Sequence, residues 1–176
     1  MRISPTSRRR SGATSVEFAF VAILLFMLLF GIFEYGRFLF VYHMTTNAAR
    51  DAARFAVVRT GGGTLVGEPA TVTKADIIEV WRTGMFNGKS YGAGMCGMES
   101  QITNYTVEVF AVPESDLYAA TPNLDAAGKP DWTSATFHQQ IAVRISGTYK
   151  TVVSGLIGLS SEMPFTVIVL MGSEAN

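Results

Sequence analysis

Residues 18–33 read FAFVAILLFMLLFGIF and contain no charged side chain. As an α-helix, this run of sixteen residues would be about 24 Å long, slightly short of a hydrocarbon core of about 30 Å. Aromatic and aliphatic residues resume at 38–42, so the helix can cross a bilayer over about residues 17–42 if Glu34 and Arg37 lie near one end. These two residues are three apart and can pair on one helix face.

Four arginines, at positions 2, 8, 9 and 10, precede the apolar run, and the first twelve residues contain no acid. The positive-inside rule places this basic leader in the cytoplasm and everything after Tyr42 outside. A cleaved secretory signal fits less well, because the far side of the run, GIFEYGR at residues 31–37, has no small-x-small cleavage site. The pattern therefore favours a membrane anchor with an extracytoplasmic domain.

The rest of the chain is one modest domain with an acidic balance. Of 176 residues, about 115 remain for a single core once the long helix is set aside. Residues 60–176 carry eleven acids against six bases, a net charge of −5, although the whole chain is formally neutral. This charge, without a basic and aromatic cluster, argues against nucleic acid as a partner. The single cysteine, Cys96, excludes an intramolecular disulfide.

A carboxylate, Glu17, stands directly before the apolar run. Near a bilayer centre an unpaired acid costs about 2.5 to 3.5 kcal/mol, so it requires a partner or a purpose. Two interpretations stay open. Glu17 can lie at the headgroup level, where it interacts favourably with the positive end of the helix dipole, or it can have a specific partner.

Several blocks of sequence occur in order around this acid. Gly12 is followed by four residues and then by Glu17 and Phe18. The blocks are VEFA at 16–19, LLFGIFEYGR at 28–37 and NAARDAAR at 47–54. Together they resemble the TadE-like family of pilus assembly proteins, which are type IV pilin-like. One departure is Ile23, where the family often carries a proline.

This resemblance implies processing and assembly. A prepilin peptidase would cut between Gly12 and Ala13, which separates the leader, residues 1–12, from a mature chain of 164 residues with a net charge of −4. Glu17 would pair with the new α-amino group of Ala13 in the same or a neighbouring subunit and so set the axial register. The protein would be a minor pilin or pseudopilin of a tight-adherence (Tad/Flp) type IV pilus, in the bacterial inner membrane with a periplasmic head. Implied partners are the peptidase, major and other minor pilins, the inner-membrane assembly platform and lipid.

Beyond the apolar run the pattern becomes striped. Alanines at 48, 49, 52, 53 and 56 recur with Phe55 at helical spacing, whereas Arg50, Asp51, Arg54 and Arg59 are polar. This pattern predicts a helix that leaves the membrane and packs an alanine-rich face on the head. Residues 13–59 would form one helix, ended by the glycines at 61–63. The alternative is a break at residues 45–47, with a separate soluble helix after the anchor.

The head, residues 60–176, combines a short helix with strands. Thr73 and Asp76 resemble a capping box for a helix that runs to about Arg82 and stops at Gly84. The glycines at 88, 92, 94 and 97 predict a flexible loop around Cys96. Apolar and polar side chains alternate over residues 105–111 and over 141–146, within 136–150, which predicts two half-buried strands. Residues 165–171 are more continuously apolar and predict a third strand that is central or buried on both faces. We expect residues 113–135 to be irregular.

The predicted fold is therefore α+β and type IV pilin-like, with a long N-terminal helix packed on a small antiparallel sheet. The residues offer little for chemistry. His43 and His138 form no metal-binding spacing with Cys96, and residues 88–90 lack the glycine that a phosphate-binding loop requires. We expect no cofactor, no metal and no enzymatic activity. Two alternatives to a pilin remain: an uncleaved, anchored periplasmic scaffold or binding subunit of a secretion system, and a signal-anchored envelope enzyme.

Overall fold

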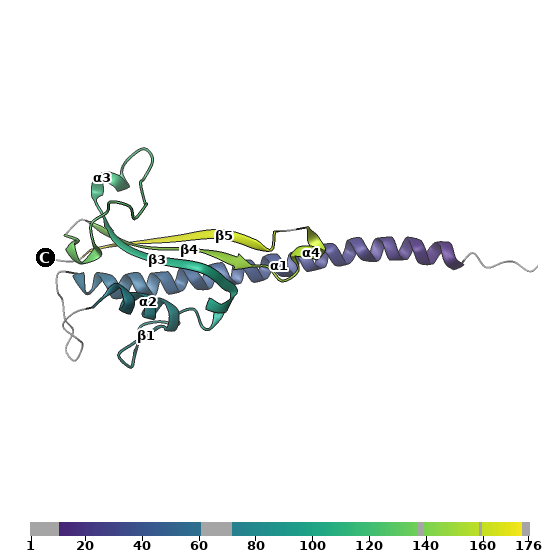
Figure 1. The fold of residues 1–176 in the computed structure, drawn as a ribbon, viewed down its shortest axis with the longest axis horizontal. Coiled ribbons are helices and arrows are strands. Elements are labelled where there is room, and N and C mark those ends of the chain that lie inside the picture. The colour runs from purple at the N-terminus through teal and green to yellow at the C-terminus, as the bar shows by residue number, and fades with distance from the viewer. Residues whose placement is uncertain (1–10, 61–71, 137–138, 159, 174–176) are drawn as a thin grey trace, which may run out of the picture.

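The computed structural model describes residues 11–60, 72–136, 139–158 and 160–173. Helix α1, Ser11–Val57, is 47 residues long and runs the length of the molecule. Most other elements gather around its C-terminal half, and α4 (Ser154–Ile157) extends beyond them towards the N-terminal half of α1 (Figure 1). Helix α1 corresponds to the helix expected over residues 13–59. The first ten residues of the expected leader and the glycines at 61–63 lie outside the described residues.

Helix α1 is continuous through residues 45–47, where the sequence allowed a break. The hydroxyls of Thr45 and Thr46 donate hydrogen bonds to the carbonyl oxygens of Val41 and Tyr42, each at 2.9 Å. Both side chains are thus satisfied by the helix's own backbone and do not compete with its hydrogen-bond ladder. The alternative of an anchor followed by a separate helix is wrong.

The sheet is three-stranded and antiparallel, in the order β3 (Ile102–Val112), β4 (Gln140–Lys150), β5 (Glu162–Gly172). The fold is α+β, and the predicted antiparallel sheet is confirmed. Residues 165–171 were expected to be central or buried on both faces, and this was wrong. They belong to β5, an edge strand on which Phe165 and Val167 are buried while Ile168 is 37% exposed.

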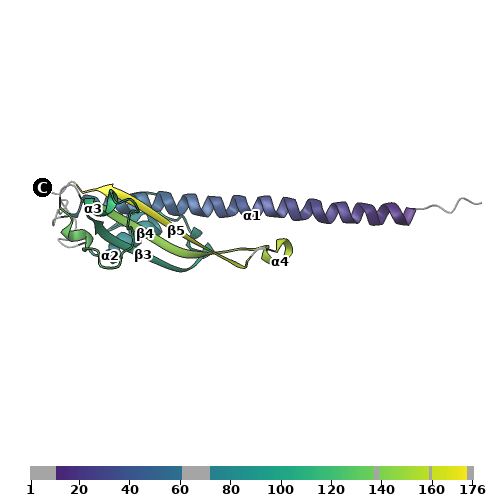
Figure 2. The same cartoon turned by 90° about the horizontal axis from the view of Figure 1, so that it is seen from above.

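One face of the sheet packs on α1 and on α2 (Lys74–Thr83), as Figures 1 and 2 show from two sides. The five alanines of the striped segment are all at most 1% exposed. Small side chains let the helix approach the sheet closely, and the side chains of Ile141, Val143 and Ile145 on β4 are completely buried in the same core. The predicted stripe thus faces the head.

Helix α2 begins and ends as its sequence indicates. The backbone N–H of Thr73 donates to the Asp76 carboxylate at 2.7 Å, which satisfies an N-terminal amide group. Gly84 ends the helix with a φ of 73°, a left-handed conformation that a residue without a Cβ adopts at little cost. Ile77, Val80 and Trp81 enter the core.

Two segments differ from expectation. Residues 85–90 form a hairpin of β1 (Met85–Phe86) and β2 (Lys89–Ser90) within the expected flexible loop; its turn residues, Asn87 and Gly88, both have the positive φ of a two-residue hairpin turn. Residues 113–135, expected to be irregular, contain α3 (Glu114–Leu117) and the 3-10 turn η3 (Trp132–Ser134). The latter segment covers the outer face of the sheet, where Leu117 and Leu124 pack on a small second cluster around Phe110.

One arginine of the polar set is buried. Arg59, just beyond the end of α1, is only 5% exposed. Its guanidinium carbon lies 3.6 Å from the Phe55 ring centroid, and Nη1 donates to the Phe55 carbonyl at 3.0 Å. Stacking on an aromatic ring stabilises a buried planar guanidinium.

Candidate functional site

Most side chains in the N-terminal half of α1 are exposed. Phe18, Leu24 and Phe33 are 72%, 65% and 71% exposed. An 18-residue window of this helix has a mean hydropathy of 2.7, and none of it is buried. We call residues 14–33 the bare segment. Its twenty residues measure about 30 Å as a helix, the thickness of a hydrocarbon core, so it is long and apolar enough to anchor the chain in a membrane.

The residues expected to be cut and aligned lie at the beginning of this segment. Gly12 and Ala13 are in the first turn of α1, and Glu17 and Phe18 follow in the next. Within the described residues, Glu17 forms no hydrogen bond or ion pair and its side chain is exposed. Ala13 and Glu17 are four residues apart, so an α-amino group created at Ala13 would lie about one turn from the carboxylate.

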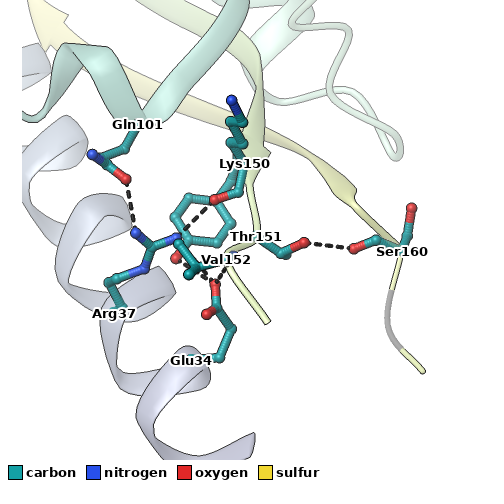
Figure 3. Close-up of polar contacts among 8 residues, drawn as sticks. Glu34, Arg37, Gln101, Lys150, Thr151, Val152 and Ser160 are labelled. Carbon is teal, nitrogen blue, oxygen red and sulfur yellow. Dashed lines mark hydrogen bonds and ion pairs between the residues drawn. The ribbon is translucent and has the colours of Figure 1, made fainter. Parts of the chain in front are cut away.

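At the other end of the bare segment, α1 enters the head at Glu34, whose residue is only 3% exposed. Its carboxylate Oε1 accepts hydrogen bonds from the Tyr149 hydroxyl at 2.9 Å, the Val152 amide at 3.2 Å and Arg37 Nη2 at 3.2 Å (Figure 3). Burying a carboxylate is costly unless it is paired and hydrogen-bonded. These three donors meet that requirement.

Arg37 extends the same cluster to two further parts of the head. Nη1 donates to Gln101 Oε1 at 2.8 Å, at the end of the 3-10 turn η2 (Met98–Gln101), and Nη2 donates to the Lys150 carbonyl at 2.8 Å, at the end of β4 (Figure 3). Its guanidinium carbon is also 5.1 Å from the Tyr149 ring centroid. The Glu34–Arg37 pair thus faces the head and ties α1 to η2 and to the β4 end. We call these residues the helix–head junction.

Tyr149 is the member of the junction whose titration is most perturbed. Complete burial and then the hydrogen bond to Glu34 raise the pKa of its hydroxyl from about 10 to about 12. Both causes oppose the phenolate, because burial disfavours a charge and a phenolate would repel the carboxylate. The hydroxyl therefore stays a proton donor to Glu34 at neutral pH.

The sequence pattern did not identify Tyr149, Gln101 or Val152 as partners of the pair. They lie 64 to 118 residues from the α1 residues that they contact. A general signal was available, since a glutamate at the end of an apolar helix that becomes buried must find several donors. Which residues supply these donors is decided by the tertiary structure.

The described residues show no cluster for metal chemistry. No group of three or more His, Cys, Asp or Glu side chains in this part of the chain is placed to hold a metal ion. Cys96 is an exposed free thiol that donates to the Ala93 carbonyl at 3.0 Å. His43 is exposed on α1, with its ring 6.3 Å from that of Tyr42, and His138 lies outside the described residues.

Comparison with known proteins gives one match. The model of a family described as TadE-like protein matches residues 12–54. This range takes in Glu17, the bare segment, the Glu34–Arg37 pair and most of the alanine stripe. No curated protein matches the chain, and no solved structure matches it. Over this N-terminal helix, the chain is similar to the TadE-like family.

Proposed function

We propose that the protein is a minor pilin or pseudopilin of a tight-adherence (Tad/Flp) type IV pilus system, with a structural and not a catalytic role. The observation that carries this proposal is the coincidence of the TadE-like match with a helix whose first half is apolar and bare. The bilayer would cover the bare segment before assembly, and the helices of other pilin-like subunits would cover it afterwards. The subunit would prime, cap or regulate the pilus.

For the membrane span we propose residues 14–33 instead of 17–42. The head already covers one face of α1 beyond this segment, since Glu34 is 3% and Val41 is 1% exposed. A chain face packed on protein cannot at the same time be solvated by lipid. The arginine-rich leader supports a cytoplasmic N-terminus and a periplasmic head at the bacterial inner membrane.

We further propose cleavage by prepilin peptidase between Gly12 and Ala13. The bond lies in the first turn of α1. The first four amide groups of a helix have no partner within it, so unwinding this turn for a protease sacrifices few hydrogen bonds. The new amino group at Ala13 would pair with Glu17 of its own or a neighbouring subunit. A pair of opposite charges in an apolar bundle fixes register, because a misplaced subunit leaves both unpaired.

The test is the N-terminus of the protein after expression with its cognate prepilin peptidase. Mass spectrometry should find a chain that begins at Ala13, and a chain that begins at Met1 without the peptidase. Gly12→Val is the matched control and should stay uncut. A Cβ at position 12 meets nothing within 4 Å, so a loss of cleavage could not be ascribed to a misfolded helix. A chain that begins at Met1 despite the peptidase contradicts the processing proposal.

One observation favours the second candidate, an uncleaved membrane-anchored scaffold of a secretion system. Helix α1 begins at Ser11, before the bond that would be cut, so the last two residues of the proposed leader, Ser11 and Gly12, belong to the helix. Such a subunit would keep its basic leader and stay in the membrane. The same N-terminal analysis decides between the two.

A further inference from the structure

The connection between β4 and β5 is an uncharged apolar tip. Residues 151–158 read TVVSGLIG and contain no acid or base, whereas charged residues, Lys150 and Glu162, stand at the adjoining ends of the two strands. The segment includes the short helix α4 (Ser154–Ile157). We call residues 151–158 the β4–β5 tip. An exposed valine, Val152, is 69% accessible within it.

This tip lies on the membrane side of the head. In Figures 1 and 2, α4 is the part of the head nearest to the N-terminal half of α1, and α3 lies at the opposite end. Contacts between α4 and α1, and the 3.2 Å hydrogen bond from the Val152 amide to Glu34, hold the tip beside the C-terminal end of the bare segment. Its depth relative to a membrane is therefore set by α1.

Three polar groups in or beside the tip have partners within the chain. The Glu34 carboxylate is occupied by three donors. The Thr151 hydroxyl donates to the Ser160 carbonyl at 2.8 Å (Figure 3). The Thr151 amide donates to the Ser161 carbonyl at 3.1 Å. Entry into an interfacial layer would remove the Val152 side chain from water.

We propose that the β4–β5 tip inserts into the outer-leaflet interface of the membrane as a second lipid contact beside α1. The inference rests on the proposed span of residues 14–33. That span places Glu34 at the edge of the hydrocarbon, and the tip extends from Glu34 towards the bare segment, so it lies at the headgroup level or deeper. Lipid is the occupant because the proposed span places the membrane beside the tip, and the tip carries no charged side chain. Two lipid contacts, one at α1 and one at the tip, would together set the tilt of the head relative to the membrane.

Site-specific fluorescence can test this in the full-length chain. In a Cys96→Ser background, single cysteines at Val152 or at Gly155 would carry an environment-sensitive nitrobenzoxadiazole label, with the protein in lipid nanodiscs. Gly155 is a second site because it is exposed and a Cβ there meets nothing within 4 Å. Phe26→Cys in the bare segment is the lipid-facing control. Tyr118→Cys, 79% exposed beside α3, is the aqueous control.

Labels at both tip positions should emit at shorter wavelength than the label at 118 and lose intensity to lipids spin-labelled near the headgroup. If labels at both tip positions emit at the same wavelength as the label at 118, while lipid still quenches the label at 26, the tip proposal alone is overturned. Aqueous emission at all positions including 26 overturns the proposed span and the tip with it. A blue shift at the tip without quenching by lipid shows a protein surface there, such as a second copy of the chain, and also overturns the lipid contact.

Discussion

Two glutamates on α1 mark the two ends of the bare segment, and their surroundings differ. Glu34 is almost completely buried and accepts three hydrogen bonds from its own chain. Glu17 is exposed and has no such contact within the described residues. Glu34 thus belongs to the internal structure of the subunit. Glu17 has no partner in the described part of the chain, so its carboxylate is available to a group created by processing or supplied by another subunit.

The substitution Glu34→Gln should destabilise the head by about 2 kcal/mol, because hydrogen bonds to a charged group are lost and Arg37 stays part-buried without a counterion. Thermal unfolding in detergent, followed by the fluorescence of the buried Trp81 and Trp132, would measure this. Glu79→Gln is the matched control, since Glu79 pairs with Arg82 at the same spacing on an exposed helix surface. That variant should unfold like the wild type. Equal unfolding temperatures for Glu34→Gln and the wild type would show that the junction does not hold the head.

Tyr149 should make the head sensitive to high pH. Its hydroxyl pKa is raised in the folded state to about 12, above the usual 10, so its contribution to stability is complete below pH 10 and is lost as the pH rises from about 10 to about 12. An absorbance titration at a phenolate wavelength, of the wild type minus Tyr149→Phe, should have its midpoint near 12 in the folded protein and near 10 in denaturant. A folded-state midpoint near 10 would contradict the burial of this hydroxyl.

At the scale of the element, α1 is one helix with two kinds of surface. Its first half is apolar on all sides, whereas its second half buries a stripe of alanines on the head and exposes Arg50 and Arg54. The small side chains in the stripe set the distance between α1 and the sheet. Because the core around them is closely packed, this distance cannot adjust freely.

Enlarging one alanine of the stripe should therefore be costly. Ala52 is 0% exposed in the core shared with β4, so Ala52→Leu should lower the free energy of unfolding by about 1 to 3 kcal/mol through overpacking. Arg50→Leu, two residues away on the exposed side, adds a leucine without entering the core and serves as control. Chemical unfolding of the two variants, read by tryptophan fluorescence, tests the claim. A stable Ala52→Leu protein would mean that α1 and the sheet separate easily.

At the scale of the whole molecule, the chain is an elongated rod with a head at one end (Figure 1). The junction at Glu34 and Arg37 joins the two parts, with partners on η2 and at the end of β4. Because the head is fixed to α1 in this way, the axial position of α1 determines the axial position of the head. In an assembly of such rods, alignment at Glu17 would therefore align the heads.

Glu17→Gln should accordingly leave membrane insertion and head stability unchanged but reduce co-assembly with other pilin-like subunits. The neutral amide keeps the shape of the side chain but loses the attraction to a terminal amino group in a low-dielectric bundle. Cross-linking followed by pull-down from membranes would measure the recovery of partner subunits, with membrane fractionation as the control for insertion. Undiminished recovery of the partners argues against a role of Glu17 in register.

Much of the architecture follows from local patterns. A continuous apolar run, an alanine stripe at helical spacing and two alternating segments were enough to predict α1, its two surfaces, β3 and β4, because these features depend on side chains three or four residues apart in a helix and two apart in a strand. The capping residues Thr73 and Asp76 located α2 for the same reason. The residues that resemble the TadE-like family lie within this locally encoded part.

The positions that sequence reasoning missed are those decided by contacts between distant segments. The apolar run of β5 indicated a central strand, yet β5 lies at the edge, and residues 113–135 cover the outer face near its Leu170. Arg59 is buried because it can stack on Phe55, and Glu34 because Tyr149 and Val152 reach it from the far end of the chain. Strand order, burial of a charge and its hydrogen-bond partners depend on how remote segments pack, and no spacing along the chain encodes that packing.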